Sequence, residues 1–191
     1  MRAPLAILLL LLLTACGGHA QGSLARGVLP ARSAKAIAVS SDAFVAGGQI
    51  ALRNAGVGQN LSPSLRWTRV AGAQTYALVV QDSDSPGPKP FVHWLLWNIP
   101  GDATSLAEGV APQPTLVIPD GAHQGANDAG SVGYSGPAPP SGVHHYHFQL
   151  FALDAPLPLA GGGNLDALIA AMKGHVLASG ELIGTYTAGG A

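Results

Sequence analysis

Short apolar runs bounded by proline and glycine dominate the chain from residue 64 onward. Residues 75–81 and 91–99 are apolar, rich in aromatic and β-branched side chains, and too short for most helices, so both predict strands. Four other runs have the same character and predict further strands, at residues 64–68, 115–118, 144–153 and 182–186. The pattern is typical of a mainly β protein.

One segment follows a helical period instead. Between residues 165 and 172, apolar side chains recur at i, i+3, i+4 and i+7, with Asn164 as a suitable N-cap and Gly174 as a stop. A second, shorter turn of helix is expected near His175. Because the strands follow one another without βαβ alternation, we expect an antiparallel β-sandwich with one or two C-terminal helices.

The first residues carry a different pattern. Arg2 precedes an unbroken apolar run at residues 5–13, which is shorter than the roughly 20 residues of a membrane-spanning helix and indicates an export signal. The run ends in Leu13-Thr14-Ala15-Cys16-Gly17, which resembles a bacterial lipobox. We therefore expect a lipoprotein signal peptide over residues 1–15 and a lipid on Cys16 that anchors the protein in the bacterial envelope.

A second cleavage site competes with this one. Gly18-His19-Ala20 has small residues at both ends, so cleavage after Ala20 would leave a soluble periplasmic or secreted protein without the cysteine. After the signal, residues 16–34 are rich in Gly, Ala, Ser and Arg and predict a flexible tether. One folded domain is expected over residues 35–191.

Composition narrows the possible functions. Charged residues make up only 10% of the chain and the formal charge is -1, so the composition lacks the excess of basic residues that is typical of nucleic-acid-binding proteins. Cys16 is the only cysteine, so an intramolecular disulfide is excluded, as are a cysteine metal site and a thiol nucleophile in the domain.

Two carboxylates stand at the end of a predicted strand, where Pro86 follows Asp82 and Asp84. In extended backbone both would point to one face, and such a pair needs a cation, an imidazolium, N–H groups or a shared proton nearby. His93 in the next apolar strand needs a partner if buried, and Asp82 or Asp84 is the expected one. An ordinary solvated turn is the alternative.

Residues 144–150 alternate between two faces. His144 and Tyr146 share one face with apolar residues. The segment just before this strand contains Pro137, Pro139 and Pro140, which restrict its backbone. Together they predict a rigid pocket for a small ligand. His145 and His147 fall on the other face. With no third ligand in view, we expect these two histidines to be solvated and no metal to be bound.

Five motifs in one order resemble the phosphatidylethanolamine-binding protein family, and within it the bacterial Raf-kinase-inhibitor-like branch. They lie at residues 82–86, 93–100, 127–130, 133–140 and 144–148. The resemblance implies a β-sandwich with C-terminal helices and a pocket for phosphate-like anions, including the phosphatidylethanolamine head-group. The pocket residues implied by motif are Asp82, Asp84, Pro86, His93, Pro139, Pro140, His144 and Tyr146.

Three positions depart from the family pattern. Ser83 stands where the family has proline, Ala138 where it has cysteine, and His145 where it has arginine. Losing the guanidinium removes a permanent charge, and we expect this to weaken a structural ion pair more than ligand contacts, because residue 145 points away from the pocket face.

These observations predict a non-enzymatic binding module for phospholipid head-groups or other small phosphate-like anions, with no cofactor and no identified protein partner. The alternatives are a protease or kinase inhibitor, and a hydrolase that uses Asp82 or Asp84 with a pocket histidine and Ser83 or Ser85 as nominal nucleophile. The aspartates are expected to raise the pKa of the pocket histidines, so that affinity for a phosphate monoester rises as pH falls from 8 to 6.

Overall fold

A computed structural model describes residues 22–189 as two packed antiparallel sheets with short helices. The larger sheet has the strand order β6-β4-β3-β7-β8. Its strands are β3 (Thr75–Asp82), β4 (Phe91–Pro100), β6 (His123–Gln124), β7 (Val143–Leu153) and β8 (Val176–Thr187). The smaller sheet, in the order β1-β2-β5, contains β1 (Val39–Ser40), β2 (Leu65–Trp67) and β5 (Ser105–Leu106). The helices are α1 (Ala25–Val28), the 3-10 turn η1 (Leu52–Asn54) and α2 (Leu165–Met172).

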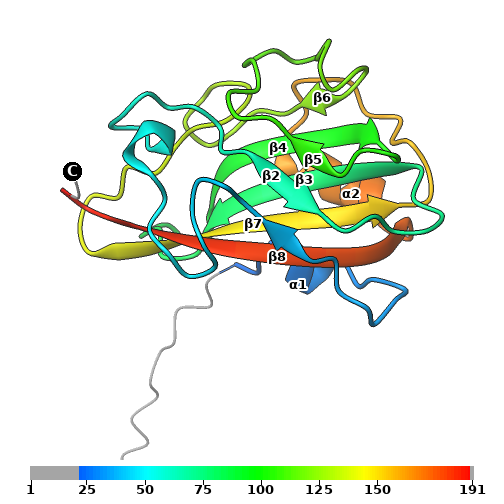
Figure 1. The fold of residues 1–191 in the computed structure, drawn as a ribbon, viewed down its shortest axis with the longest axis horizontal. Coiled ribbons are helices and arrows are strands. Elements are labelled where there is room, and N and C mark those ends of the chain that lie inside the picture. Colours follow the sequence, from blue (N-terminus) through cyan, green and yellow to red (C-terminus); the bar gives the residue numbers. More distant parts are fainter. Residues whose placement is uncertain (1–21, 190–191) are drawn as a thin grey trace, which may run out of the picture.

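The larger sheet is covered on both faces. One face packs against the smaller sheet through an apolar core that includes Leu78, Phe148 and, from the smaller sheet, Leu65. The other face packs against α1 and α2 through a second core that includes Val79 and Met172. Figure 1 looks through these layers, with β2 and β5 on the near side and α2 behind the larger sheet. The predicted mainly β fold with antiparallel sheets is confirmed.

The double cover explains the sequence pattern of the central strand. All eight residues of β3 are buried, because β3 lies in the middle of the larger sheet and both of its faces are covered. A strand in this position has no solvent face and therefore shows a continuous apolar run instead of alternation.

Helix α2 forms where the sequence predicts it. The Asn164 side chain accepts a hydrogen bond from the Ala167 backbone N–H at 3.0 Å, which caps the first turn. Gly174, with φ of +81°, follows the last turn and reverses the chain into β8. In the described residues no helix is long and apolar enough to cross a membrane.

Two predicted elements are wrong. Residues 115–118 form no strand: Thr115 makes one isolated bridge to His123, and a turn follows it. Three prolines between residues 112 and 119 remove backbone donors that a strand ladder needs. No helical turn forms at His175 either, because β8 begins at the next residue and pairs with β7 along its whole length.

Strand β8 runs from Val176 to Thr187, although the sequence predicted a strand only at residues 182–186, because glycine interrupts the strand pattern before residue 182. Gly180 lies against the backbone of Ile37, and a Cβ at this position would collide with the Ile37 carbonyl. The glycine that looks like a strand breaker in the sequence is therefore required by close approach of another segment.

The predicted tether also differs from the structure in its described part. Ala25 and Leu29 are buried against the larger sheet. The Ala25 backbone N–H donates to Gln81 Oε1 and the Arg26 N–H donates to Gln149 Oε1, each at 2.8 Å. Residues from 22 onward thus belong to the folded domain, whereas Cys16 and the predicted signal peptide lie outside the described residues.

Candidate functional site

A cavity of about 390 Å³ opens where β3, β4 and β7 meet the proline-rich segment after β6. Seven of the eight predicted pocket residues line it, and Asp84 is the exception. The seven are Asp82, Pro86, His93, Pro139, Pro140, His144 and Tyr146. Strand register brings these distant residues together, because Asp82 pairs with Phe91 of β4 on one side and with Tyr146 of β7 on the other.

Asp82 and His144 form a buried pair. His144 Nδ1 lies 2.6 Å from Asp82 Oδ2, and both side chains are less than 10% exposed. The second carboxylate oxygen of Asp82 accepts the Asp84 backbone N–H at 2.8 Å. Because the carboxylate holds His144 Nδ1 as a donor, His144 Nε2 is the ring nitrogen left for a ligand.

His93 is bound differently from the prediction. Its Nδ1 donates to the Ser135 carbonyl at 2.6 Å, and neither aspartate is its hydrogen-bond partner. Burial lowers the pKa of His93 below its usual value, although the Ser135 carbonyl and the charge of Asp82 oppose that shift. The predicted rise of the pocket histidine pKa is therefore wrong for His93, because desolvation outweighs attraction to the aspartate.

Tyr146 carries the most informative polar atom of the cavity. The residue is only 1% exposed, and its hydroxyl oxygen is buried without a hydrogen-bond partner in the described part of the chain. Its ring meets His93 edge to face, with centroids 5.1 Å apart. Burial, reinforced by the charges of Asp82 and Asp84, raises the pKa of Tyr146 far above its usual value, so the hydroxyl keeps its proton and is a donor. A buried donor without a partner costs about 1–3 kcal/mol unless a bound molecule accepts from it.

The walls of the cavity are stiff and mainly apolar. Pro139, Pro140 and Ala138 form one side, and Phe91 packs against His93 with ring centroids 4.9 Å apart. Gly136 lies so close to the backbone of residues 54–56 that a Cβ would meet the Gly56 nitrogen at 2.6 Å. A rigid wall of this kind lowers the entropy lost when a small ligand is ordered.

Several lining residues were absent from the predicted set. Phe91 stands two residues before His93 on the same strand, so period-two alternation would have found it. Ser85, Ala129, Ser135, Gly136 and Ala138 also line the cavity and lie in or beside the recognised motifs. Their contribution depends on loop geometry, which alternation does not predict.

Asp84 points away from the cavity and pairs with His145. Its Oδ2 accepts the His145 backbone N–H at 2.7 Å and lies 2.8 Å from His145 Nδ1. Partial burial acts to raise the pKa of Asp84, but the hydrogen bonds from His145 outweigh it and the pKa is lowered. The prediction that Asp82 and Asp84 point to the same face of the sheet is wrong. Strand β3 ends at Asp82, so the alternation of side chains does not continue to Asp84.

His147 is not solvated as predicted. Its side chain is only 13% exposed and lies between Ser83 and Glu181. This position is on the face of the larger sheet that packs against α1 and α2, the outer face, whereas the inner face packs against the smaller sheet. Among residues 22–189 no group of three or more His, Cys, Asp or Glu side chains is placed to hold a metal ion.

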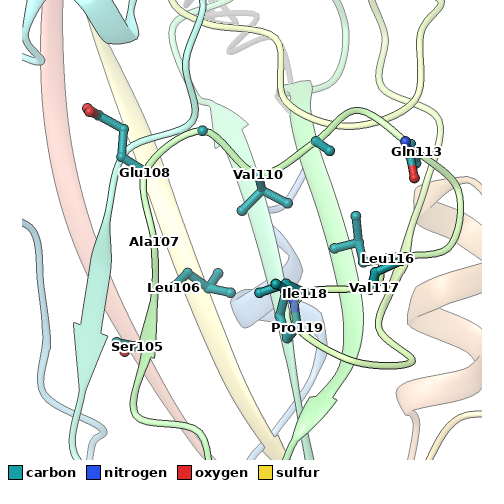
Figure 2. A pocket seen from close by; sticks show the side chains of 12 residues that line it. Ser105, Leu106, Ala107, Glu108, Val110, Gln113, Leu116, Val117, Ile118 and Pro119 are labelled. Carbon is teal, nitrogen blue, oxygen red and sulfur yellow. The ribbon is translucent and has the colours of Figure 1, made fainter.

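A second cavity, of about 440 Å³, is lined by residues 105–119 and differs in chemistry from the first. Its lining is mostly apolar and includes Leu106, Val110 and Ile118, with Glu108 as its one charged residue. Figure 2 shows the Glu108 carboxylate directed away from these apolar side chains. This cavity lacks the convergent polar groups that a site for a charged ligand needs.

Comparison with known proteins agrees with the fold. The family model described as phosphatidylethanolamine-binding protein matches residues 40–187. The chain belongs to the phosphatidylethanolamine-binding protein family. It is 45% identical over 152 residues to a UPF0098 protein of Methanothermobacter thermautotrophicus, a match that covers 79% of this chain and 99% of the relative.

Two solved structures extend this likeness to three dimensions. E. coli YbcL, described as a member of the mammalian PEBP family, superposes with a TM-score of 0.74 at 30% identity, covering 80% of this chain and 99% of YbcL. A phosphatidylethanolamine-binding protein homolog from Chlamydia trachomatis superposes with a TM-score of 0.69 at 33% identity, covering 79% and 97%. Membership in this family supports a binding function in general terms.

Proposed function

We propose that the cavity of this family member binds phospholipid head-groups or other small phosphate-like anions, and that a lipid on Cys16 holds the protein at the bacterial envelope. The observation that carries the proposal is the buried hydroxyl of Tyr146, a residue of the cavity wall, which has no hydrogen-bond partner among residues 22–189. A phosphate oxygen is a strong acceptor of the kind that this donor lacks.

The histidines supply the remaining polar contacts. His93 and His144 line the cavity, and both use Nδ1 for protein contacts, so Nε2 of each is left for the ligand. This nitrogen donates to a phosphate oxygen only in the imidazolium form, which carries a proton on both ring nitrogens. The two oxygens of Asp82 are engaged by His144 and the Asp84 N–H, which offsets the repulsion that a free carboxylate would exert on an anion. The volume of about 390 Å³ suits a head-group-sized ligand.

Calorimetric titration tests this function. Glycerophosphoethanolamine, inorganic phosphate, ethanolamine and glycerol are titrated into the purified protein at pH 6 and pH 8. The two phosphate compounds are expected to bind, with affinity that falls when Tyr146 is changed to Phe, whereas ethanolamine and glycerol are expected to give no saturable heat. Binding of ethanolamine alone, or phosphate binding that Tyr146→Phe and His144→Gln leave unchanged, would contradict the proposal.

Anchoring is tested separately. Mass spectrometry of the mature protein from its host is expected to find a lipid-modified N-terminal Cys16, and Cys16→Ala is expected to move the protein from the membrane to the soluble fraction. A mature N-terminus at Gln21 would instead show cleavage after Ala20 and a protein without the anchor.

A further inference from the structure

Three side chains on the outer face of the larger sheet form a chain of hydrogen bonds. Ser83 Oγ lies 3.0 Å from His147 Nε2, and His147 Nδ1 lies 3.0 Å from Glu181 Oε1. Ser83 directly follows β3, His147 belongs to β7 and Glu181 to β8, so neighbouring parts of one sheet hold all three. The order of contacts, hydroxyl to Nε2 and Nδ1 to carboxylate, is that of an activated serine nucleophile.

The hydrogen bonds define the tautomer of the imidazole. Glu181 accepts at Nδ1, so neutral His147 carries its proton there and has a free lone pair on Nε2 that faces the Ser83 hydroxyl. Hydrogen bonding from His147 lowers the pKa of Glu181 against the opposing effect of burial, which keeps this carboxylate ionised at neutral pH. Arg26 Nη1 of α1 lies 3.7 Å from the other carboxylate oxygen and holds it from the far side.

The three residues differ in access to solvent in a way that suits these roles. The side chains of His147 and Glu181 are 13% and 18% exposed, whereas Ser83 is partly open to solvent at the end of its strand. The Ser83 hydroxyl also lies 3.3 Å from Asp84 Oδ2, which is a second acceptor for the same proton. A substrate can therefore approach Ser83 while the base and the carboxylate stay held by the sheet.

The geometry points to Ser83 as a nucleophile for acyl transfer from small esters, with His147 as general base and Glu181 as the residue that positions it. Ser83 Oγ attacks the ester carbonyl carbon and its proton passes to His147 Nε2. The bond from that carbon to the alcohol oxygen breaks, and His147 returns the proton to the leaving alkoxide. A water molecule then attacks the acyl carbon and gives a proton to His147 Nε2. The bond from that carbon to Ser83 Oγ breaks, His147 returns the proton to Ser83 Oγ, and the carboxylic acid leaves.

This site is separate from the cavity of the proposed binding function. Asp82 and Ser83 are consecutive and lie on opposite sides of the sheet, as do Tyr146 and His147. The hydrolase considered from the sequence combined Ser83 with His93 or His144, but the structure directs both of these histidines to the other face. The inference adds a chemical activity to the outer face and does not depend on what the cavity binds.

Covalent labelling tests the nucleophile. An alkyl fluorophosphonate is incubated with the purified protein, and the adduct, in which a Ser Oγ–P bond replaces the P–F bond, is located by peptide mass spectrometry. We expect one adduct on Ser83, no adduct in Ser83→Ala, and labelling slowed about 100-fold in His147→Gln. Ser105→Ala, which removes an exposed serine on the smaller sheet, is the matched control and is expected to label like the wild type.

The positioning role of Glu181 has its own readout. Labelling needs neutral His147, so its rate is expected to rise with pH, in a surrounding that includes Glu181, Asp84, Arg26 and His145. Glu181→Gln is expected to move the midpoint of this profile to lower pH as well as to slow labelling, whereas a smaller folded population alone would slow labelling and leave the midpoint in place. Hydrolysis of 4-nitrophenyl acetate by the same variants is expected to follow the same order.

Three results would overturn the inference. The first is the absence of an adduct under conditions that label a known serine hydrolase. The second is labelling in which His147→Gln reacts as fast as the wild type. The third is labelling abolished by His144→Ala or by saturating glycerophosphoethanolamine, since either would place the reactive group in the cavity on the opposite face.

Discussion

The two faces of the larger sheet carry the same chemical groups in different surroundings. On the inner face, His144 pairs with Asp82 and both side chains are less than 10% exposed. On the outer face, His145 pairs with Asp84, and these side chains are 49% and 39% exposed. Each pair is an imidazole beside a carboxylate at a similar distance, 2.6 Å inside and 2.8 Å outside.

The difference between the pairs shows that burial decides what such a pair does. In water, solvent screens the charges and satisfies any polar group that loses its partner, so the outer pair contributes little. In the cavity no such compensation exists, and each polar atom must find a protein or ligand partner. In the proposed function the inner pair therefore orients groups for a ligand, whereas the outer pair joins two chain segments at the surface.

Removal of the carboxylate from each pair should give the largest contrast. Asp82→Ala leaves His144 and the Asp84 N–H without their acceptor in a buried site, and we expect the free energy of unfolding to fall by about 3 kcal/mol. Asp84→Ala is the matched control at the surface and is expected to cost less than about 1 kcal/mol. Urea unfolding at pH 7 measures both, and equal costs would show that burial does not separate the pairs.

Tyr146→Phe separates ligand binding from stability on the inner face. The change removes a hydroxyl that has no protein partner, so the free energy of unfolding is expected to stay the same or rise by up to about 1 kcal/mol. Affinity for glycerophosphoethanolamine is expected to fall about tenfold, which corresponds to about 1.4 kcal/mol. Calorimetry and urea unfolding of the same preparation check both values, and a large loss of stability would show that the hydroxyl serves the fold instead.

The pH dependence of ligand binding tests the contribution of His93 on the inner face. An anion favours the imidazolium form, and because burial lowers the pKa of His93 from 6.5, affinity should rise mainly below that pH. The rise expected from the sequence between pH 8 and 6 therefore moves to more acidic solution. We expect an increase of about fivefold between pH 6.5 and 5.5, within the limit of tenfold per pH unit for one proton.

Calorimetry with glycerophosphoethanolamine suits this measurement, because a phosphodiester keeps its charge over the range. His93→Gln is expected to flatten the profile. The same shift acts on stability with the opposite sign, since unfolded His93 binds a proton more readily than the folded residue and stability falls as pH drops through 6.5. Binding that strengthens only above pH 7 would contradict the role of His93.

The smallest effect is expected on the outer face. His145→Arg restores the residue that the family pattern has at this position and places a permanent charge beside Asp84. At pH 8 the free energy of unfolding is expected to rise by less than about 0.5 kcal/mol, because the pair is exposed. Affinity for glycerophosphoethanolamine is expected to stay within about twofold, and a larger change would show that the outer pair influences the cavity.

Much of the fold was predictable because its signals are local. The apolar runs of β3 and β4, and the helix with its Asn164 cap and Gly174 stop, are encoded within short segments and formed as predicted. Elements whose form depends on distant segments were missed. Gly180 interrupts the strand pattern because Ile37 packs on it, and residues 25–29 looked like tether because the sheet that buries them is assembled from later strands.

The candidate site divides in the same way. The residue types at the cavity were visible in the sequence, since carboxylates, imidazoles and a phenol stand beside prolines at the ends of apolar strands. Their partners were not visible. His93 bonds to a carbonyl 42 residues away, and His147 meets a serine and a glutamate that are 64 and 34 residues away.

By itself, the sequence determined the strand-rich architecture, the late helix, the family and the set of chemical groups at the cavity, because period, caps and motif order are properties of short segments. Tertiary structure alone decided that Asp84 leaves the cavity, that Tyr146 has no partner and that Ser83 meets His147. The physical reason is that strand register and burial across distant segments determine which polar atoms meet, and neither is contained in any one segment.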